Sequence, residues 1–475
     1  MTEDLQRSAL WAAWSRADLT LDQLWVRYFA LGGTADLTDI DAHLHGLGEL
    51  PDTERDVLAH AVNERLAELF TQHRVPYARA IREPRPTSGP LAALVSLLDS
   101  VGAAPPERLP ALVSAAGRLL DVDVTLYRID HEQRCLVRLG GTTGRRRLGV
   151  ESTMAGRAFR TLQVVASDRD GGPRLWVPVM DGADRLGVLE VRVEHAAALQ
   201  DPALREQCTS LASLLGFVLV SMEPYGDGLE RPRRTQAMTP AAELVWAQLP
   251  PLTAATDSFV IAGRLEPSYA LGGDVFDYAL SENTVSLGIF DAVGHGMPAA
   301  LIAAATLAAY RSVRRDARSV FDQARAVDEV VAGHFSGSQF VTAVIAEIDL
   351  ASGRLRYVNA GHPAPLLLRE GRVVKELGGG RRVPFGLESS GLTVGEEVLE
   401  PGDWLALYTD GITEARDESG AWFGEERLAE FLRRAIAGGH APAETVRRLT
   451  EAVLRHQGGL LQDDASVLLA RWKQP

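Results

Sequence analysis

The sequence predicts an α+β protein made of several domains. Three observations support this class: a length of 475 residues, a helical pattern that dominates the first part of the chain, and strand-like runs mixed with helical blocks in the rest. The chain is longer than a single-core domain, and a typical size of roughly 150 residues per domain indicates about three domains. Hydrophobic residues make up 46% of the chain and charged residues 24%, so each domain can bury a core.

Residues 1–85 are predicted to form a helical N-terminal domain. Apolar residues recur at three- and four-residue spacing in Leu21–Phe29 and again in Val57–Phe70. A packing or dimerising unit is the plain interpretation, and a ligand sensor is the alternative. Three prolines within Arg82–Pro90 then indicate a stiff, extended boundary.

Residues 91–222 are predicted to form a central α+β domain with one antiparallel sheet. Leu175–Met180 and Leu186–Val193 alternate as strands do, and Asp181-Gly182 between them predicts a hairpin turn. Through Val177-Pro178-Val179, this turn and Leu186–Leu189, the stretch resembles a GAF sensor domain. Whether it binds a ligand stays open, because no motif in this stretch identifies the polar residues of a ligand pocket.

Residues 223–250 are predicted to link the central domain to the last one. Thr239 and Pro240 suit the cap and first turn of a helix that extends to Leu249, where Pro250-Pro251 ends it. This helix is either a rigid spacer or a regulatory lever. Dimerisation through it and the GAF-like domain is a further hypothesis, based on its apolar stripe.

Bulk properties limit the partners of the chain. A net charge of -14 argues against nucleic acid, because binding to its phosphates needs clustered Lys and Arg. The N-terminus is acidic where a signal peptide is basic, and no apolar stretch approaches the 18 or so residues of a membrane span. The two cysteines lack metal-type spacing. These features predict a cytoplasmic protein without a membrane partner.

Residues 251–475 are predicted to form a layered α+β domain with acidic residues at its strand ends. Asp274 opens a strand, Asp291 and Asp410 follow strands, and Asp463-Asp464 precedes the last one. A single Asp-Gly pair is most often a turn, but carboxylates at several strand ends can gather oxygen ligands for a hard cation. The combination predicts one metal site.

The order and flanks of these motifs resemble the metal-dependent protein phosphatases (PPM, type 2C), in the RsbU/SpoIIE branch of bacterial stress and sporulation phosphatases. The resemblance extends from Ser258 to Trp472 and implies an α-β-β-α sandwich. Its motifs are Leu271–Asp277, Asp291–Leu301, Asn359–Pro365, Leu407–Ala415 and Asp463–Val467.

The resemblance also implies the ligands of two Mn²⁺ or Mg²⁺ ions. Asp291 would bridge the ions and Ala292 would contribute its carbonyl oxygen, while Asp274, Asp410 and Asp463 would complete the catalytic set. Asp464 could replace its neighbour, because sequence does not tell which side chain of an adjacent pair points inward; Asp463 is favoured. No Cys or His cluster accompanies these oxygens, which disfavours zinc.

Four polar residues near the motifs are not assigned to catalysis. His295 and His362 lie in loops flanked by Gly or Pro and are expected to be structural hydrogen-bonding groups. Asp277 and Glu414 either support the ligands from behind or face solvent.

The functional hypothesis is a protein serine/threonine phosphatase controlled by the GAF-like domain. The resemblance points to a phosphorylated anti-sigma-factor antagonist of the STAS type as substrate and to a homodimer. A non-catalytic signalling scaffold is the main alternative, and a di-metal hydrolase of small phosphoesters is a third.

Overall fold

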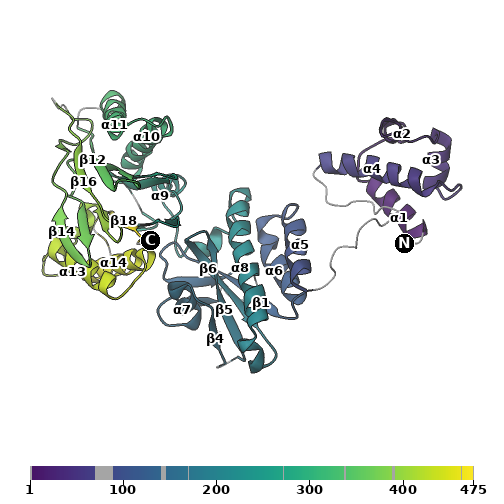
Figure 1. The fold of residues 1–475 in the computed structure, drawn as a ribbon, viewed down its shortest axis with the longest axis horizontal. Helices are drawn as coiled ribbons and strands as arrows, with labels where there is room; N and C mark the ends of the chain where they lie inside the picture. The colour runs from purple at the N-terminus through teal and green to yellow at the C-terminus, as the bar shows by residue number, and fades with distance from the viewer. Residues whose placement is uncertain are drawn as a thin grey trace.

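The computed structural model describes three compact groups of elements, each with its own buried core (Figure 1). We refer to them as the N-terminal unit, the central unit and the C-terminal unit. The described residues are 3–69, 89–140, 146–168, 171–270, 272–335, 338–387, 391–459, 461 and 463–473.

The N-terminal unit contains four helices that pack on one another. They are α1 (Glu3–Trp14), α2 (Leu21–Ala30), α3 (Leu37–Leu44) and α4 (Asp52–Glu68). Leu24 and Tyr28 of α2 and Leu58 and Val62 of α4 are fully buried between them. The helical pattern of this region is therefore confirmed up to Glu68. The proline-rich boundary at residues 82–90 lies outside the described residues except for Gly89 and Pro90, which open α5.

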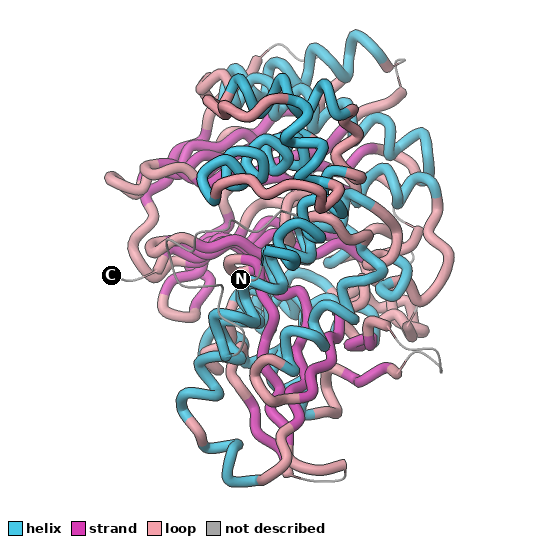
Figure 2. Tube along the Cα trace, turned by 90° about the vertical axis from the view of Figure 1, so that its right-hand side faces the viewer, coloured by secondary structure: helices cyan, strands magenta, loops and turns pink. Residues whose placement is uncertain are grey.

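The central unit is built on one antiparallel six-stranded sheet of order β3-β2-β1-β6-β5-β4. The hairpin between β5 and β6 is confirmed, since Asp181 pairs with Asp184 across the turn. Helices flank the sheet (Figure 1), and Figure 2 shows the helices and strands of the whole chain from a perpendicular direction. The elements are α5 (Gly89–Val101), α6 (Leu109–Arg118), β1 (Asp123–Ile129), β2 (Cys135–Arg138), β3 (Arg147–Gly149), α7 (Met154–Thr161), β4 (Val165–Ser167), β5 (Arg174–Asp181), β6 (Asp184–Arg192) and α8 (Pro202–Met222), with 3-10 turns η1 (Pro106–Arg108) and η2 (Ala196–Gln200).

Helix α8 has a composition that the sequence analysis did not expect. Its region Pro202–Tyr225 is long and apolar enough to cross a membrane, judged by length and composition alone. In the fold, 44% of its apolar window is buried, and Leu211, Leu215 and Leu219 lie in the core of the central unit. Packing against the sheet therefore accounts for much of its hydrophobicity.

The connecting segment, residues 223–252, contains two 3-10 turns and one short helix. They are η3 (Glu223–Tyr225), η4 (Arg231–Arg233) and α9 (Pro240–Trp246). Thr239 caps α9 as predicted, since its hydroxyl accepts a hydrogen bond from the amide of Ala242 (3.2 Å). The helix ends earlier than expected, and Ala242 and Val245 are buried in the core of the C-terminal unit. The apolar stripe expected to serve dimerisation is thus already used within the chain.

The C-terminal unit is an α-β-β-α sandwich, as predicted. One sheet has the order β15-β12-β11-β10-β9 with β16 paired to β12, and the other has the order β14-β13-β17-β18-β8-β7. Helices α10 and α11 pack on the first sheet, and α14 packs on the second. The strands are β7 (Thr253–Ala255), β8 (Phe259–Glu266), β9 (Asp274–Leu280), β10 (Thr284–Ala292), β11 (Val341–Asp349), β12 (Arg354–Ala360), β13 (Leu366–Arg369), β14 (Arg372–Glu376), β15 (Arg381–Arg382), β16 (Gly395–Val398), β17 (Trp404–Tyr408) and β18 (Ala465–Trp472); the helices are α10 (Gly296–Arg315), α11 (Val320–His334), α12 (Asp410–Thr413), α13 (Gly424–Ala437) and α14 (Pro442–His456).

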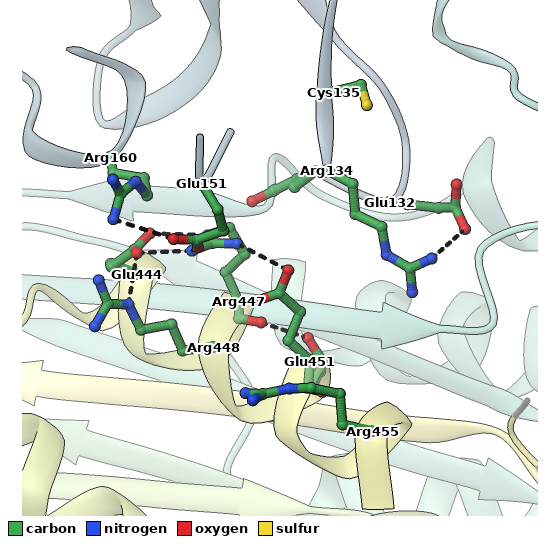
Figure 3. Close-up of polar contacts among 12 residues, drawn as sticks. Glu132, Arg134, Cys135, Glu151, Arg160, Glu444, Arg447, Arg448, Glu451 and Arg455 are labelled. Carbon is green, nitrogen blue, oxygen red and sulfur yellow. Dashed lines mark hydrogen bonds and ion pairs between the residues drawn. The ribbon is translucent and has the colours of Figure 1, made fainter. Parts of the chain in front are cut away.

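Ion pairs join the central unit to α14 (Figure 3). Glu444 on α14 accepts from Arg185 of β6 (3.2 Å) and from Arg447 one turn further along α14 (2.8 Å). Arg447 also pairs with Glu151 of the central unit. The side chains of Glu444, Arg185 and Arg447 are 6%, 4% and 1% exposed. Because buried charges are stable only when paired, the contact fixes α14 against the central unit.

Candidate metal centre

The two sheets bring four strand ends of the C-terminal unit together. Asp274 is the first residue of β9, and it pairs with Asp291 near the end of β10. Asp410 begins α12 directly after β17, and Asp463-Asp464 precedes β18. Since β17 and β18 are antiparallel neighbours, the end of one lies beside the start of the other.

Asp464 fastens the two sheets to each other. Its Oδ2 accepts hydrogen bonds from the backbone amides of Gly272 (2.7 Å) and Gly273 (2.9 Å), immediately before β9. Asp463 is exposed, and its Oδ1 accepts only from the adjacent amide of Asp464 (2.9 Å) among the hydrogen bonds described. Asp464 is therefore engaged by backbone, whereas Asp463 is available to a ligand.

Two glycines permit the close approach of these strand ends. A Cβ atom on Gly273 would lie 2.1 Å from the carbonyl oxygen of Ala292, and one on Gly411 would lie 1.9 Å from that of Asp464. Both distances are far inside van der Waals contact. The Gly272-Gly273-Asp274 and Asp410-Gly411 motifs thus have a packing reason for glycine.

Threonines orient the two innermost carboxylates. Thr409 donates to Oδ2 of Asp274 (2.8 Å), and the hydroxyl of Thr342 lies 3.4 Å from Oδ2 of Asp291. Thr342 is also hydrogen-bonded to Nδ1 of His362 (2.8 Å). Burial lowers the pKa of His362 to about 3, so its ring is neutral and acts as a fixed hydrogen-bonding partner.

The carboxylates raise one another's pKa. Burial raises the pKa of Asp274 well above its usual range, and the charges of Asp291 and Asp464 raise it further. Burial, followed by repulsion from Asp410, Asp463 and Asp464, raises the pKa of Asp291 to about 7. Burial and the charges of Glu414 and Asp463 raise the pKa of Asp410. Each effect indicates negative charge gathered without compensation.

The donor chemistry of the cluster fits a hard divalent cation. Within the described ranges, none of the five aspartates forms an ion pair with Arg or Lys. The oxygen-only set matches Mg²⁺ and Mn²⁺ preferences. Among those same residues, no three His, Cys, Asp or Glu side chains are already placed as close as the ligands of one ion. Small side-chain adjustments would therefore accompany binding.

The other polar residues singled out in the sequence have different surroundings. Asp277 is 2% exposed and pairs with Arg311 (2.7 Å) and Arg314 (2.9 Å), so it is not a solvent-facing residue. Glu414 is exposed; its backbone amide donates to the carbonyl of Asp410 (2.7 Å), and the charge of its side chain raises the pKa of Asp410. His295 is an exposed residue at the start of α10 and makes no capping bond with its side chain. Sequence reasoning offered no ground to assign a role to Thr342 or Thr409, because neither a threonine within a strand nor one between a strand and a helix is a functional signal by itself.

Comparisons with known proteins agree with this architecture. Residues 281–473 match the Stage II sporulation protein E (SpoIIE) family. The phosphoserine phosphatase RsbU of Bacillus subtilis is 24% identical over 217 residues, which cover 44% of this chain and 61% of that protein. RsbP, a phosphoserine phosphatase of the same organism, is 29% identical over 167 residues, which cover 33% of this chain and 40% of RsbP.

Solved structures of similar proteins cover the same part of the chain. The RsbU and RsbW domains of Rv1364c from Mycobacterium tuberculosis are 30% identical, with a TM-score of 0.40 and coverage of 46% of this chain and 62% of that one. A structure of RsbX with magnesium also matches, with 12% identity, a TM-score of 0.36 and coverage of 46% of this chain and 98% of that one. A structure of the PstP catalytic domain with two manganese ions matches with 16% identity, a TM-score of 0.33 and coverage of 46% of this chain and 100% of that one.

The sandwich and the acidic strand ends define the C-terminal unit as a PP2C-type (PPM) phosphatase domain. Within that class, residues 281–473 match the model of the SpoIIE family. The chain matches between 40% and about 60% of the lengths of the two curated relatives above.

Proposed function

We propose that this chain is a metal-dependent protein serine/threonine phosphatase whose site is the aspartate cluster. The observation that carries the proposal is the meeting of Asp274, Asp291, Asp410 and Asp463 at four strand ends of two sheets, with no ion pair to Arg or Lys among the described residues. Carboxylates gathered in this way repel one another, and bound divalent cations would offset that repulsion. The match of residues 281–473 to the SpoIIE family supports the same conclusion.

Asp291 and the backbone carbonyl of Ala292 are among the groups that would hold two divalent cations in this proposal. Asp274, Asp410 and Asp463 complete the set, and the backbone bonds of Asp464 argue for Asp463 over its neighbour. Mn²⁺ or Mg²⁺ bound here would lower the pKa of a water and neutralise phosphate charge. Thr409 and Thr342 hold two of the carboxylates in position, which limits reorganisation during turnover.

We infer that the substrate is phosphoserine or phosphothreonine on a signalling protein. RsbU and RsbP are named as phosphoserine phosphatases, which supports the residue type. A phosphorylated anti-sigma-factor antagonist of the STAS type is the proposed partner. A site at exposed strand ends suits a phosphorylated loop of such a protein, because Asp463 and Glu414 lie at the surface.

We propose that the N-terminal and central units regulate this site. We also propose that the protein is located in the cytoplasm. The division into residues 1–85, 91–222, 223–250 and 251–475, and the GAF-like character of the second part, belong to this proposal. A homodimer belongs to it as well. Because α9 is packed within the chain, the exposed side of α8 with Phe217 and Val220 is the better candidate for the dimer interface. Sedimentation as a monomer at high micromolar concentration would refute dimerisation.

The test compares the full-length protein with an Asp291→Asn variant on a phosphoserine protein. We expect turnover with Mn²⁺, none with EDTA, and a loss of more than about 100-fold in the variant. Asp316→Asn, at an exposed position after α10, is the matched control and should retain full activity. Turnover that survives in Asp291→Asn would show that the chemistry resides elsewhere.

A further inference from the structure

A cavity lies between the central unit and the connecting segment, away from the aspartate cluster. Its volume is about 260 Å³. The ends of β1 and β6 form one wall, and the end of α8, η4 and α9 with the following loop form the others. The loop is anchored to the C-terminal unit, since the carbonyl of Pro251 accepts from Tyr278 (2.7 Å) and that of Gln248 from Arg311 (2.6 Å). A ligand in this cavity would contact elements that join two units.

Arg128 is the unusual residue of this cavity. Its side chain is 3% exposed, and one nitrogen, Nη2, donates to Glu223 (2.9 Å). Its Nε and Nη1 are buried without a hydrogen-bond partner. Arg233 competes for the same Glu223 oxygen (3.1 Å), so the carboxylate is shared between two guanidinium groups. Buried donors of a charged group are costly when unpaired, and Arg128 therefore requires an acceptor that the protein does not supply.

The same wall also carries negative charge. Asp181 and Asp184, at the two sides of the β5–β6 turn, both line the cavity. Burial raises the pKa of Asp184, and the nearby charges of Arg128 and Arg233 only partly oppose that effect. The only hydrogen bond described for the Asp184 carboxylate comes from the adjacent amide of Arg185 (3.1 Å). An ammonium group would supply the missing partner.

The charge pattern selects the class of ligand. The lining has three arginines and four carboxylates, so a purely anionic ligand would meet Asp181 and Asp184. A purely cationic ligand would leave the donors of Arg128 unpaired. A small molecule with both charges satisfies both kinds of group, and the rest of it can pack against Trp246 and Leu249, which also line the cavity.

We propose that this cavity is a binding site for a small zwitterion of the amino-acid type. The carboxylate of the ligand pairs with the guanidinium group of Arg128, its ammonium donates to Asp184, and its side chain faces Trp246. The volume suits a molecule of this size. Bound there, the ligand bridges the central unit and the connecting segment, so binding stabilises the junction.

The test uses the full-length protein and the twenty standard L-amino acids at about 5 mM, a concentration at which a ligand with a millimolar dissociation constant raises the melting temperature measurably. Calorimetric titration then measures affinity for the compound with the largest shift. Two analogues of that compound, one without the amine and one without the carboxylate, test the requirement for both charges. We expect at least one amino acid to bind and both analogues to bind at least about tenfold more weakly.

Three variants locate the site. Arg128→Lys and Asp184→Asn should each weaken binding at least about tenfold, because each removes charge-assisted hydrogen bonds to the ligand. Arg157→Gln, at an exposed position on α7 away from the cavity, should bind as the unmodified protein does. If Arg128→Lys fails to fold, Asp184→Asn decides the outcome. No shift with any amino acid, equal binding of a single-charge analogue, or unchanged affinity in Asp184→Asn would overturn the proposal.

Discussion

At the scale of single residues, Asp291 shows how the site depends on charge. It is held at the end of β10 beside Asp274, where burial and three further aspartates raise its pKa to about 7. Without metal, this arrangement opposes folding at neutral pH, because ionisation of Asp291 is easier in the unfolded chain.

This effect predicts a pH dependence for the metal-free protein. The folded-state pKa of Asp291 lies above its unfolded value, so its contribution to stability is present at about pH 4 and is lost as the pH rises through about 7. Scanning calorimetry in EDTA should show the unmodified protein losing stability relative to Asp291→Asn over this interval. Mn²⁺ should restore it in the unmodified protein only. Parallel pH profiles for the two proteins would contradict this view of the cluster.

A second prediction concerns Gly273. In Gly273→Ala the new methyl group would collide with the carbonyl of Ala292 and displace the start of β9, so activity should fall about 100-fold. Gly333→Ala is the control, because a Cβ at Gly333 in α11 meets nothing within 4 Å. It should leave turnover unchanged and stabilise the helix by about 0.5–1 kcal/mol. Phosphatase assays with denaturant titrations would separate the two effects, and full activity of Gly273→Ala would count against the required close approach.

Residue identities were only partly predictable from sequence. The aspartates stood out because each adjoins an apolar strand with glycine nearby. The choice between Asp463 and Asp464 depended on hydrogen bonds to Gly272 and Gly273, about 190 residues away in the chain. Such long-range partners leave no local pattern, and the same reason hid Thr342 and Thr409.

At the scale of elements, α14 connects the central unit to the phosphatase domain. The helix packs on β8 and on β18, the strand that follows Asp463-Asp464. Its first turns pair with Arg185 and, as Figure 3 shows, with Glu151. Sequence reasoning placed the helix correctly from its periodicity. It could not foresee the buried ion pairs, because an amphipathic helix normally presents its charged face to water.

Loss of Glu444 should therefore destabilise the junction strongly. Glu444→Gln leaves Arg185 and Arg447 buried without their shared carboxylate, at a cost of about 3–5 kcal/mol. Glu430→Gln removes surface pairs of α13 and should change stability far less than Glu444→Gln does. Denaturant unfolding measures both, and a double-mutant cycle with Arg185→Gln gives the coupling across the junction. A coupling energy near zero would show that the contact does not hold the units together.

At the scale of the whole molecule, the sequence predicted the order of the units and the α-β-β-α sandwich. It did not predict that α9 of the connecting segment packs into the core of the C-terminal unit. Composition alone made residues 223–250 resemble a linker. In the structure Ala242 and Val245 belong to the same core as β9, β10 and α10. The distinction depends on tertiary packing, which a short apolar helix does not reveal by itself.

Because α9 belongs to the core of the C-terminal unit, fragments with and without this helix should differ in stability. A fragment of residues 239–475 retains α9 and should fold with a cooperative melting transition, whereas residues 251–475 should be less stable because the core loses a helix. Calorimetry and solubility measurements on both fragments test this. Equal stability would show that α9 contributes nothing to the phosphatase domain.

The central claim is that Asp274, Asp291, Asp410 and Asp463 hold divalent cations. Anomalous diffraction at the manganese edge, from crystals of the protein soaked in Mn²⁺, tests it most directly. We predict two peaks among these carboxylates, with one of them beside the carbonyl of Ala292, and no such peaks in Asp291→Asn crystals. Crystals that diffract well and show no anomalous density at these strand ends would contradict the account.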